Sequence, residues 1–70
     1  MSPIFVPEEK VRLPEDVPGL GLKRGTVGRV IYVYPNRPHM ADVEFPRENG
    51  KYAIGILTKD PELCVVDFYP

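Results

Sequence analysis

The sequence predicts a small all-β protein, a five-stranded and partly open barrel with a one-turn 3₁₀ helix before its last strand. Nine prolines are spread over the 70 residues. The longest stretch without proline, residues 19–34, contains four glycines before a run of β-branched and aromatic residues. Proline costs about 3 kcal/mol and glycine about 1 kcal/mol inside a helix, so no amphipathic helix of useful length is expected. Short runs of alternating apolar and polar residues, bounded by turn residues, predict strands instead.

The first half of the chain is expected to form two strands joined by a long loop. Residues 9–13 alternate apolar with charged side chains, as a short half-buried strand does. Residues 13–22 follow as an exposed loop whose apolar side chains fold back over one end of the barrel. The second strand, residues 26–34, is rich in Val, Ile, Thr and Tyr. Its alternation fails at Val30 and Ile31, which indicates either burial on both faces or a β-bulge.

The second half is expected to supply two further long strands. Residues 39–45 alternate cleanly, and the dipeptide Asn49-Gly50 that follows is a strong hairpin-turn signal. Residues 51–57 form the next strand, in which Gly55 marks a bend or a close approach. We expect Ala41, Val43 and Phe45 to point inward, and Tyr52, Ile54 and Ile56 to share one face of their strand.

The chain is expected to end in a 3₁₀ turn and a fifth strand. Residues 58–63 contain a proline suited to a first helical turn, and residues 64–68 form the last short strand. A chain of 70 residues allows one domain. We therefore expect residues 1–70 to be a single barrel with extended tails at both ends.

The charge balance argues against a strong nucleic-acid binder. Nine basic residues stand against ten acidic ones, which gives a formal net charge of -1. Strong nucleic-acid binders carry a basic excess, because their affinity comes largely from neutralising phosphates. No stretch approaches the roughly 20 apolar residues of a membrane-spanning helix, and the N-terminus lacks the regions of a signal peptide. We therefore expect a cytoplasmic protein with no membrane association.

One histidine and one cysteine leave little room for metal or thiol chemistry. A zinc site needs several convergent ligands, whereas His39 and Cys64 are the sole residues of their types. We interpret His39 as a solvated residue at a strand start, and Cys64 as a small buried side chain. Asp42 and Glu44 share a strand face, but a small barrel offers no dry pocket in which one carboxyl would stay protonated. The sequence thus predicts no enzyme and no cofactor.

A glycine pattern in the second strand resembles the KOW type, in which two spaced glycines precede a valine-rich strand. Here the pattern covers residues 23–33, and its glycines are Gly25 and Gly28, which let the chain turn tightly and bulge. The resemblance implies a small SH3-like barrel, a module found in ribosomal proteins and transcription factors on nucleic-acid or protein surfaces.

Further segments extend the resemblance to most of the chain. Together they are similar to a family of short stand-alone bacterial SH3-like proteins, for which the resemblance implies a fold and no established chemistry. The matching segments are residues 11–16, 23–30, 42–45, 49–51 and 63–66. A fainter similarity, over residues 13–35, is to the C-terminal barrel of nitrile hydratase β subunits. The helical remainder of that subunit is absent here, so this similarity implies the barrel alone.

The aromatic residues suggest a protein-binding surface. One short barrel cannot bury three phenylalanines and four tyrosines together with the apolar tails. An exposed apolar patch usually marks an interface; equally, the two tails could pack on each other as an extra edge strand. We expect a non-catalytic protein-binding or scaffold module, such as an accessory subunit of a larger complex, or one that self-associates. Its expected binding residues are Phe5, Tyr32, Tyr34 and Tyr69, with Arg29 and Arg37 as polar anchors.

The alternative is a KOW-like module that binds nucleic acid. Its phosphate contacts would come from Lys23, Arg24, Arg29 and Arg37. The competing interpretation of these side chains is that they pair with nearby carboxylates such as Asp42, Glu44 or Glu48. The slightly negative net charge favours that pairing and disfavours nucleic acid as the partner.

Overall fold

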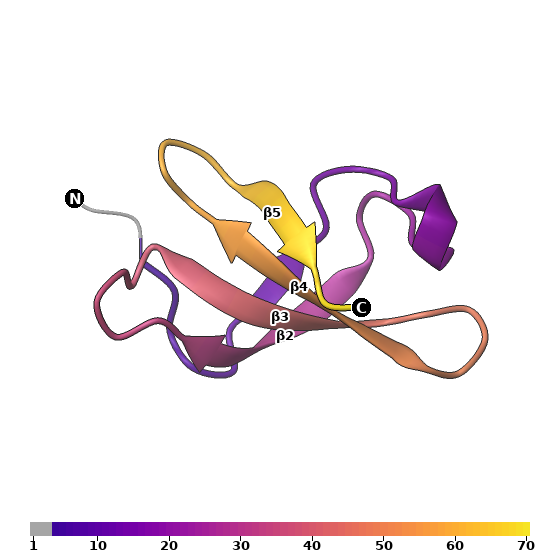
Figure 1. Ribbon diagram of the computed structural model, residues 1–70, viewed down its shortest axis with the longest axis horizontal. Coiled ribbons are helices and arrows are strands. Elements are labelled where there is room, and N and C mark those ends of the chain that lie inside the picture. The colour runs from indigo at the N-terminus through magenta and orange to yellow at the C-terminus, as the bar shows by residue number, and fades with distance from the viewer. Residues whose placement is uncertain (1–3) are drawn as a thin grey trace.

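The computed structural model describes residues 4–70, whose strands form one antiparallel sheet (Figure 1). The strands follow one another across the sheet in chain order. They are β1 (Lys10–Arg12), β2 (Val27–Val33), β3 (Met40–Pro46), β4 (Tyr52–Thr58) and β5 (Cys64–Phe68). Each end lies within one residue of the sequence-based expectation, so the five strands of an all-β chain are confirmed. Residues 1–3 of the expected N-terminal tail lie outside the described residues.

The sheet is open and irregular. Within residues 4–70 every ladder joins strands that are consecutive in the chain, and none joins β1 to β5. Closure into a barrel is therefore not shown by strand pairing. The β2–β3 register shifts between Val30 and Tyr32. Val30 is buried and Ile31 is 41% exposed, so the break in alternation is a bulge and not burial on both faces.

The core lies on one side of the sheet, which we call the inner face. Three alternating residues of β3 are buried there as expected, namely Ala41, Val43 and Phe45. Their partners on β4 are Leu57, Gly55 and Ala53. The residues Tyr52, Ile54 and Ile56 do share a face, and this register turns that face away from the core. A Cβ at Gly55 would lie 2.8 Å from Phe68 Cε1, so this glycine marks the close approach of β5.

The loop between β1 and β2 covers one end of the core, as expected. Leu13 and Leu22 are buried, and Leu20 packs against the same cluster. Arg47 Nε donates a hydrogen bond of 2.9 Å to the Leu20 carbonyl, which ties this loop to the β3–β4 turn. The turn itself is closed at Gly50, whose φ of 81° agrees with the hairpin signal.

The 3₁₀ turn lies in a different place from the one expected. Within residues 4–70 it is η1 (Pro18–Leu20), between β1 and β2, and the expectation for residues 58–63 is wrong. There Thr58 Oγ1 accepts the N–H of Asp60 at 3.2 Å, a local side-chain bond that competes with a helical turn. In η1, by contrast, Pro18 presets the first turn, and Gly21 ends it in the left-handed region with φ of 66°.

The N-terminal segment, residues 4–9, is fastened to β2, to the β2–β3 turn and to the β4–β5 loop. The Phe5 N–H donates to the Pro38 carbonyl at 2.8 Å, beside the β2–β3 turn. The Phe5 ring enters the core, and Lys59 Nζ lies 4.4 Å from its centre. The same Nζ is 2.7 Å from Glu9 Oε2. The segment therefore connects β2 with the β4–β5 loop. Within residues 4–70 the N-terminal segment pairs with β2 and the C-terminal tail with β4, so these two parts of the chain do not pair with each other.

Candidate functional site

The side of the sheet opposite the core carries a continuous set of polar and aromatic side chains. Residues directly opposite in an antiparallel ladder point to the same side. The register therefore places on one side Arg29 and Tyr32 of β2, Asp42 and Glu44 of β3, and Tyr52, Ile54 and Ile56 of β4. Tyr69 joins them from the C-terminal tail, because its N–H donates to the Ile54 carbonyl at 2.9 Å. We call these eight residues the outer face.

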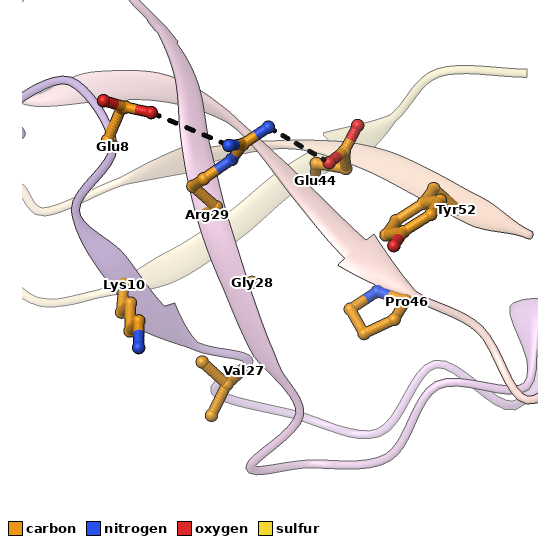
Figure 2. Close-up of a pocket in the computed structure, with 8 residues that line it drawn as sticks. All are labelled: Glu8, Lys10, Val27, Gly28, Arg29, Glu44, Pro46 and Tyr52. Atoms are coloured by element: carbon orange, nitrogen blue, oxygen red, sulfur yellow. Dashed lines mark ion pairs between the residues drawn. The ribbon is translucent and has the colours of Figure 1, made fainter.

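A hollow of about 400 Å³ surrounds Arg29 at one end of the outer face (Figure 2). The guanidinium lies between two carboxylates, 3.6 Å from Glu8 Oε1 and 3.7 Å from Glu44 Oε1. Pro46 and Tyr52 border the same hollow from β3 and β4 (Figure 2). The Arg29 charge is thus balanced locally, and Tyr52, which is 62% exposed, contributes an aromatic ring to the hollow.

A hydrogen-bonded cluster occupies the middle of the outer face. The hydroxyls of Tyr34 and Tyr69 donate to the two oxygens of the Asp42 carboxylate, at 2.9 Å and 3.0 Å. The two hydroxyl oxygens are 3.4 Å apart. The hydrogen bonds with Tyr69 and with Asp42, together with desolvation, raise the pKa of Tyr34 well above its ordinary value of 10.0. Tyr34 is therefore a neutral donor at neutral pH, and the cluster holds the C-terminal tail on the sheet.

A second hollow lies beyond this cluster, at the turn between β2 and β3. Its volume is about 430 Å³, and its lining residues are Tyr32, Tyr34, Pro35, Asn36, Arg37 and Met40. The rings of Tyr32 and Tyr34 meet edge to face, with their centroids 5.2 Å apart and an angle of 71° between their planes. Tyr32 belongs to both features, since it stands on the outer face and at the rim of this hollow.

Five of the six expected protein-binding residues gather in this region, and one does not. Tyr32, Tyr69 and Arg29 are on the outer face, and the remaining two, Tyr34 and Arg37, line the second hollow. Phe5, the sixth, is 2% exposed and belongs to the core, which corrects its assignment to a surface. A single ring could satisfy either environment, so the sequence carried no signal that would have separated Phe5 from the tyrosines.

Sequence reasoning missed Asp42 and Tyr52 as members of the region. Asp42 was considered as a partner for basic side chains, whereas two tyrosine hydroxyls bind it. Alternation alone places Tyr52 beside Ile54 and Ile56 but leaves open which side of the sheet they face. The β3–β4 register, which pairs Pro46 with Tyr52, decides which side of the sheet these residues face.

The four basic residues of the nucleic-acid alternative do not form one track. Lys23 Nζ is 3.7 Å from Glu48 Oε1, and Arg29 has the two carboxylates described above. Arg24 lies in the β1–β2 loop and Arg37 in the β2–β3 turn, at opposite ends of β2. A strand rises about 3.3 Å per residue, so the length of β2 separates these two side chains. The expected pairing with carboxylates is confirmed for Lys23 and Arg29.

The residues that could carry chemistry are dispersed. Within residues 4–70 no group of three or more His, Cys, Asp or Glu residues could hold a metal ion. Cys64 is exposed, contrary to the buried position expected, because it opposes Thr58 on the side of the sheet away from the core. His39 is half-buried just before β3, and its carbonyl accepts the Lys59 N–H at 2.8 Å. None of the helical structure described in residues 4–70 is long and apolar enough to cross a membrane.

Comparison with known proteins places the chain in a family. Residues 9–60 match the family model described as Domain of unknown function (DUF4926). Neither the curated proteins nor the solved structures gave a match. The matched residues run from the end of the N-terminal segment through β4 and include Arg29, Tyr32 and Asp42 of the outer face. The chain belongs to the DUF4926 family.

Proposed function

We propose that this domain is a non-catalytic protein-binding module that docks a partner on its outer face, as a scaffold or an accessory subunit of a larger complex. The observation that carries the proposal is the exposure of three tyrosines on that one face. Tyr32 is 50% exposed, Tyr52 is 62% exposed and Tyr69 is 46% exposed. Tyrosine is among the residue types that contribute most to binding at protein interfaces.

The packing beneath these rings supports a preformed surface. Ile54 and Ile56 are half-buried between them, and the hydrogen bonds of Asp42 fix the Tyr69 side chain across the sheet. Ordering the Tyr69 side chain on binding would therefore cost this domain little conformational entropy, which favours affinity. The resemblance of the sequence motifs to stand-alone SH3-like domains agrees with a binding role, although a fold alone does not determine function.

The charges of the region favour a protein over a nucleic acid. The side chains on and beside the outer face include three cations and three carboxylates, namely Lys10, Arg29 and Arg37 against Glu8, Asp42 and Glu44. A polyanion would meet no basic excess there. A protein surface, with both signs of charge and apolar area, meets matching chemistry.

The test is site-specific photo-crosslinking in cells that express the protein naturally. A benzophenone amino acid replaces Tyr52 in one variant, Tyr32 in another, and Glu15 in the control. Glu15 is an exposed loop residue away from the outer face. We expect one protein adduct of the same mass from both tyrosine positions and none from Glu15. An adduct equally strong at Glu15, or none at either tyrosine, contradicts the proposal.

A parallel titration examines the nucleic-acid alternative. Single- and double-stranded RNA and DNA are added to the purified domain at low salt, and intrinsic tyrosine fluorescence is followed. Phosphate-driven binding loses affinity steeply as salt increases. We expect no saturable change, and a saturable, salt-sensitive change would favour the nucleic-acid module instead.

A further inference from the structure

The hollow at the β2–β3 turn is built on a rigid pair of turns that share one residue. The Arg37 N–H donates to the Tyr34 carbonyl at 3.1 Å, and the Arg37 carbonyl accepts the Met40 N–H at 2.8 Å. Each bond closes a four-residue turn, and each turn has proline at its second position, Pro35 in the first and Pro38 in the second. Proline presets the backbone angle that this position requires. The backbone of Arg37 is therefore fixed on both sides.

The apolar walls of the hollow are held as firmly as its backbone. The Tyr34 hydroxyl is bound to Asp42 at 2.9 Å, which prevents the ring from turning away. Tyr32 leans on Tyr34 edge to face, and Met40 is half-buried beside them. The hollow of about 430 Å³ exceeds by many times the roughly 30 Å³ that one water molecule occupies. It can therefore accept an apolar side chain.

The charge of the hollow is a single cation. Of the six lining residues, Arg37 alone is charged. The ion pairs found within residues 4–70 involve Lys23, Arg29 and Lys59, and none involves Arg37. A guanidinium offers a fork of donors that suits a carboxylate. The neighbouring side chain, Asn36, adds an amide donor.

We infer that this hollow binds an acidic segment of a protein partner, with an apolar side chain against Tyr32 and Met40 and an adjacent carboxylate on Arg37. The inference rests on the proposed protein-binding function and names the chemistry of the partner at one end of the same surface. Charge complementarity selects the occupant. A basic segment is repelled by Arg37, and a nucleic acid finds one cation where it needs several.

The test is an NMR titration of the ¹⁵N-labelled full chain with capped synthetic peptides. The probe places a leucine before two glutamates, and the matched peptides carry glutamine or lysine at those two positions. We expect the glutamate peptide to shift the amide signals of Tyr32, Asn36 and Met40 saturably. It should bind about fivefold tighter than the glutamine peptide, as one exposed ion pair allows. The preference should shrink as salt is added.

Two variants assign the preference to one side chain. Arg37→Gln should remove the preference for glutamate over glutamine while leaving the weaker apolar binding. Changing the arginine and the glutamates separately and together forms a double-mutant cycle, which isolates the contact between the two charges. The matched control is Arg24→Gln, which removes an exposed arginine of the β1–β2 loop and should leave the preference intact. A preference that survives Arg37→Gln, or disappears in Arg24→Gln, overturns the inference.

The remaining outcomes separate the inference from the proposed function. Equal binding of the glutamate and lysine peptides, or no binding of any peptide, overturns the acidic-segment inference. Saturable shifts at the same amides with a short oligothymidylate, and none with peptides, also overturn it in favour of single-stranded nucleic acid. If the peptides bind equally or not at all, crosslinks at Tyr52 would still support protein binding. Failure of those crosslinks would remove the proposed function itself.

Discussion

At the scale of single residues, the clearest constraint is the contact between Gly28 and Phe45. A Cβ at Gly28 would lie 2.6 Å from Phe45 Cδ1 and 2.7 Å from the Glu44 carbonyl oxygen. Real side chains do not approach so closely, and the carbonyl belongs to a paired strand that cannot move away. The glycine therefore allows β2 to pass directly over the largest buried ring of β3. Its neighbour Gly25, with φ of 90°, serves a different purpose in the turn before the strand.

Replacing Gly28 by alanine should destabilise the domain more than any comparable change in a loop. We expect Gly28→Ala to lower the free energy of unfolding by at least about 2 kcal/mol, the range of overpacked cores. The matched control is Gly19→Ala, because a Cβ there meets nothing within 4 Å. Urea unfolding followed by circular dichroism measures both. Equal midpoints for the two variants would show that β2 and β3 separate at little cost.

At the scale of elements, the N-terminal segment is held by Lys59, which lies in the β4–β5 loop. Its Nζ contacts the Glu9 carboxylate at 2.7 Å and the Ile4 carbonyl at 3.1 Å, and it stands over the Phe5 ring. Both charged side chains are about three-quarters buried, with exposed fractions of 21% and 28%. Partial burial makes such an ion pair stronger than a surface pair and makes the loss of one partner costly.

Removing the cation should therefore loosen the segment. We expect Lys59→Met to cost about 1–2 kcal/mol of unfolding free energy, from the lost ion pair and the lost contact with the ring. The control is Lys51→Met, at an exposed lysine of the β3–β4 turn. Thermal unfolding should separate the two variants by several degrees. Identical melting temperatures would mean that the backbone hydrogen bonds of the segment and the Phe5 side chain hold it without help from Lys59.

The same contact predicts a loss of stability in acid. Desolvation raises the pKa of Glu9, but the hydrogen bonds from Lys59 and Val6 and the Lys59 charge outweigh it, so the pKa is lowered from 4.5. The stabilisation by Glu9 is therefore complete above its ordinary value of 4.5 and disappears as the pH falls through the lower folded value. In urea unfolding, Glu9→Gln should reduce the loss of unfolding free energy that occurs between about pH 5 and pH 2. If the variant loses as much unfolding free energy in acid as the unmodified protein, the acid sensitivity comes from other carboxyls.

At the scale of the whole molecule, stability should decrease from the centre of the sheet to its edges. β3 is paired on both sides and carries three buried residues. β5 is paired on one side, and its residues are half-buried or exposed. β1 has three residues. Local opening occurs where few apolar contacts must be broken.

Amide hydrogen exchange measured by NMR should follow this order. We expect the slowest exchange at amides of β3 and of the inner residues of β4, and faster exchange in β5 and in the C-terminal tail. Asp42→Asn should accelerate exchange of the Tyr69 amide further, because it weakens the acceptor that holds the tail. Exchange as slow in β5 as in β3 would indicate that its free edge is covered, for example by another copy of the chain.

The local structure of this protein was readable from the order of its residues. The positions of proline and glycine excluded long helices, and the alternation of apolar and polar residues located the five strands to within one residue. The inward side of β3 was also readable, because it follows from strict alternation along the chain. The broken alternation at Val30 left burial on both faces and a bulge as alternatives, and the pairing of β2 with β3 decided for the bulge. The 3₁₀ turn was misplaced, since two proline-containing segments compete for it. The left-handed Gly21 favours the first segment, and the hydrogen bond accepted by Thr58 disfavours the second.

Three features were not readable from residue order, namely which side of β4 faces the core, where the Phe5 ring lies, and what surrounds Arg37. Each depends on register or on contacts between residues distant in the chain, and a shift of one residue would reverse every side chain of a strand. The aromatic surplus visible in the sequence thus became a particular outer face only when β3 paired with β4. Asp42 accepts hydrogen bonds from two tyrosines because the C-terminal tail returns across the sheet and places Tyr69 beside Tyr34. The composition gives the number of aromatic rings and charges, whereas the pairing of strands fixes where they lie.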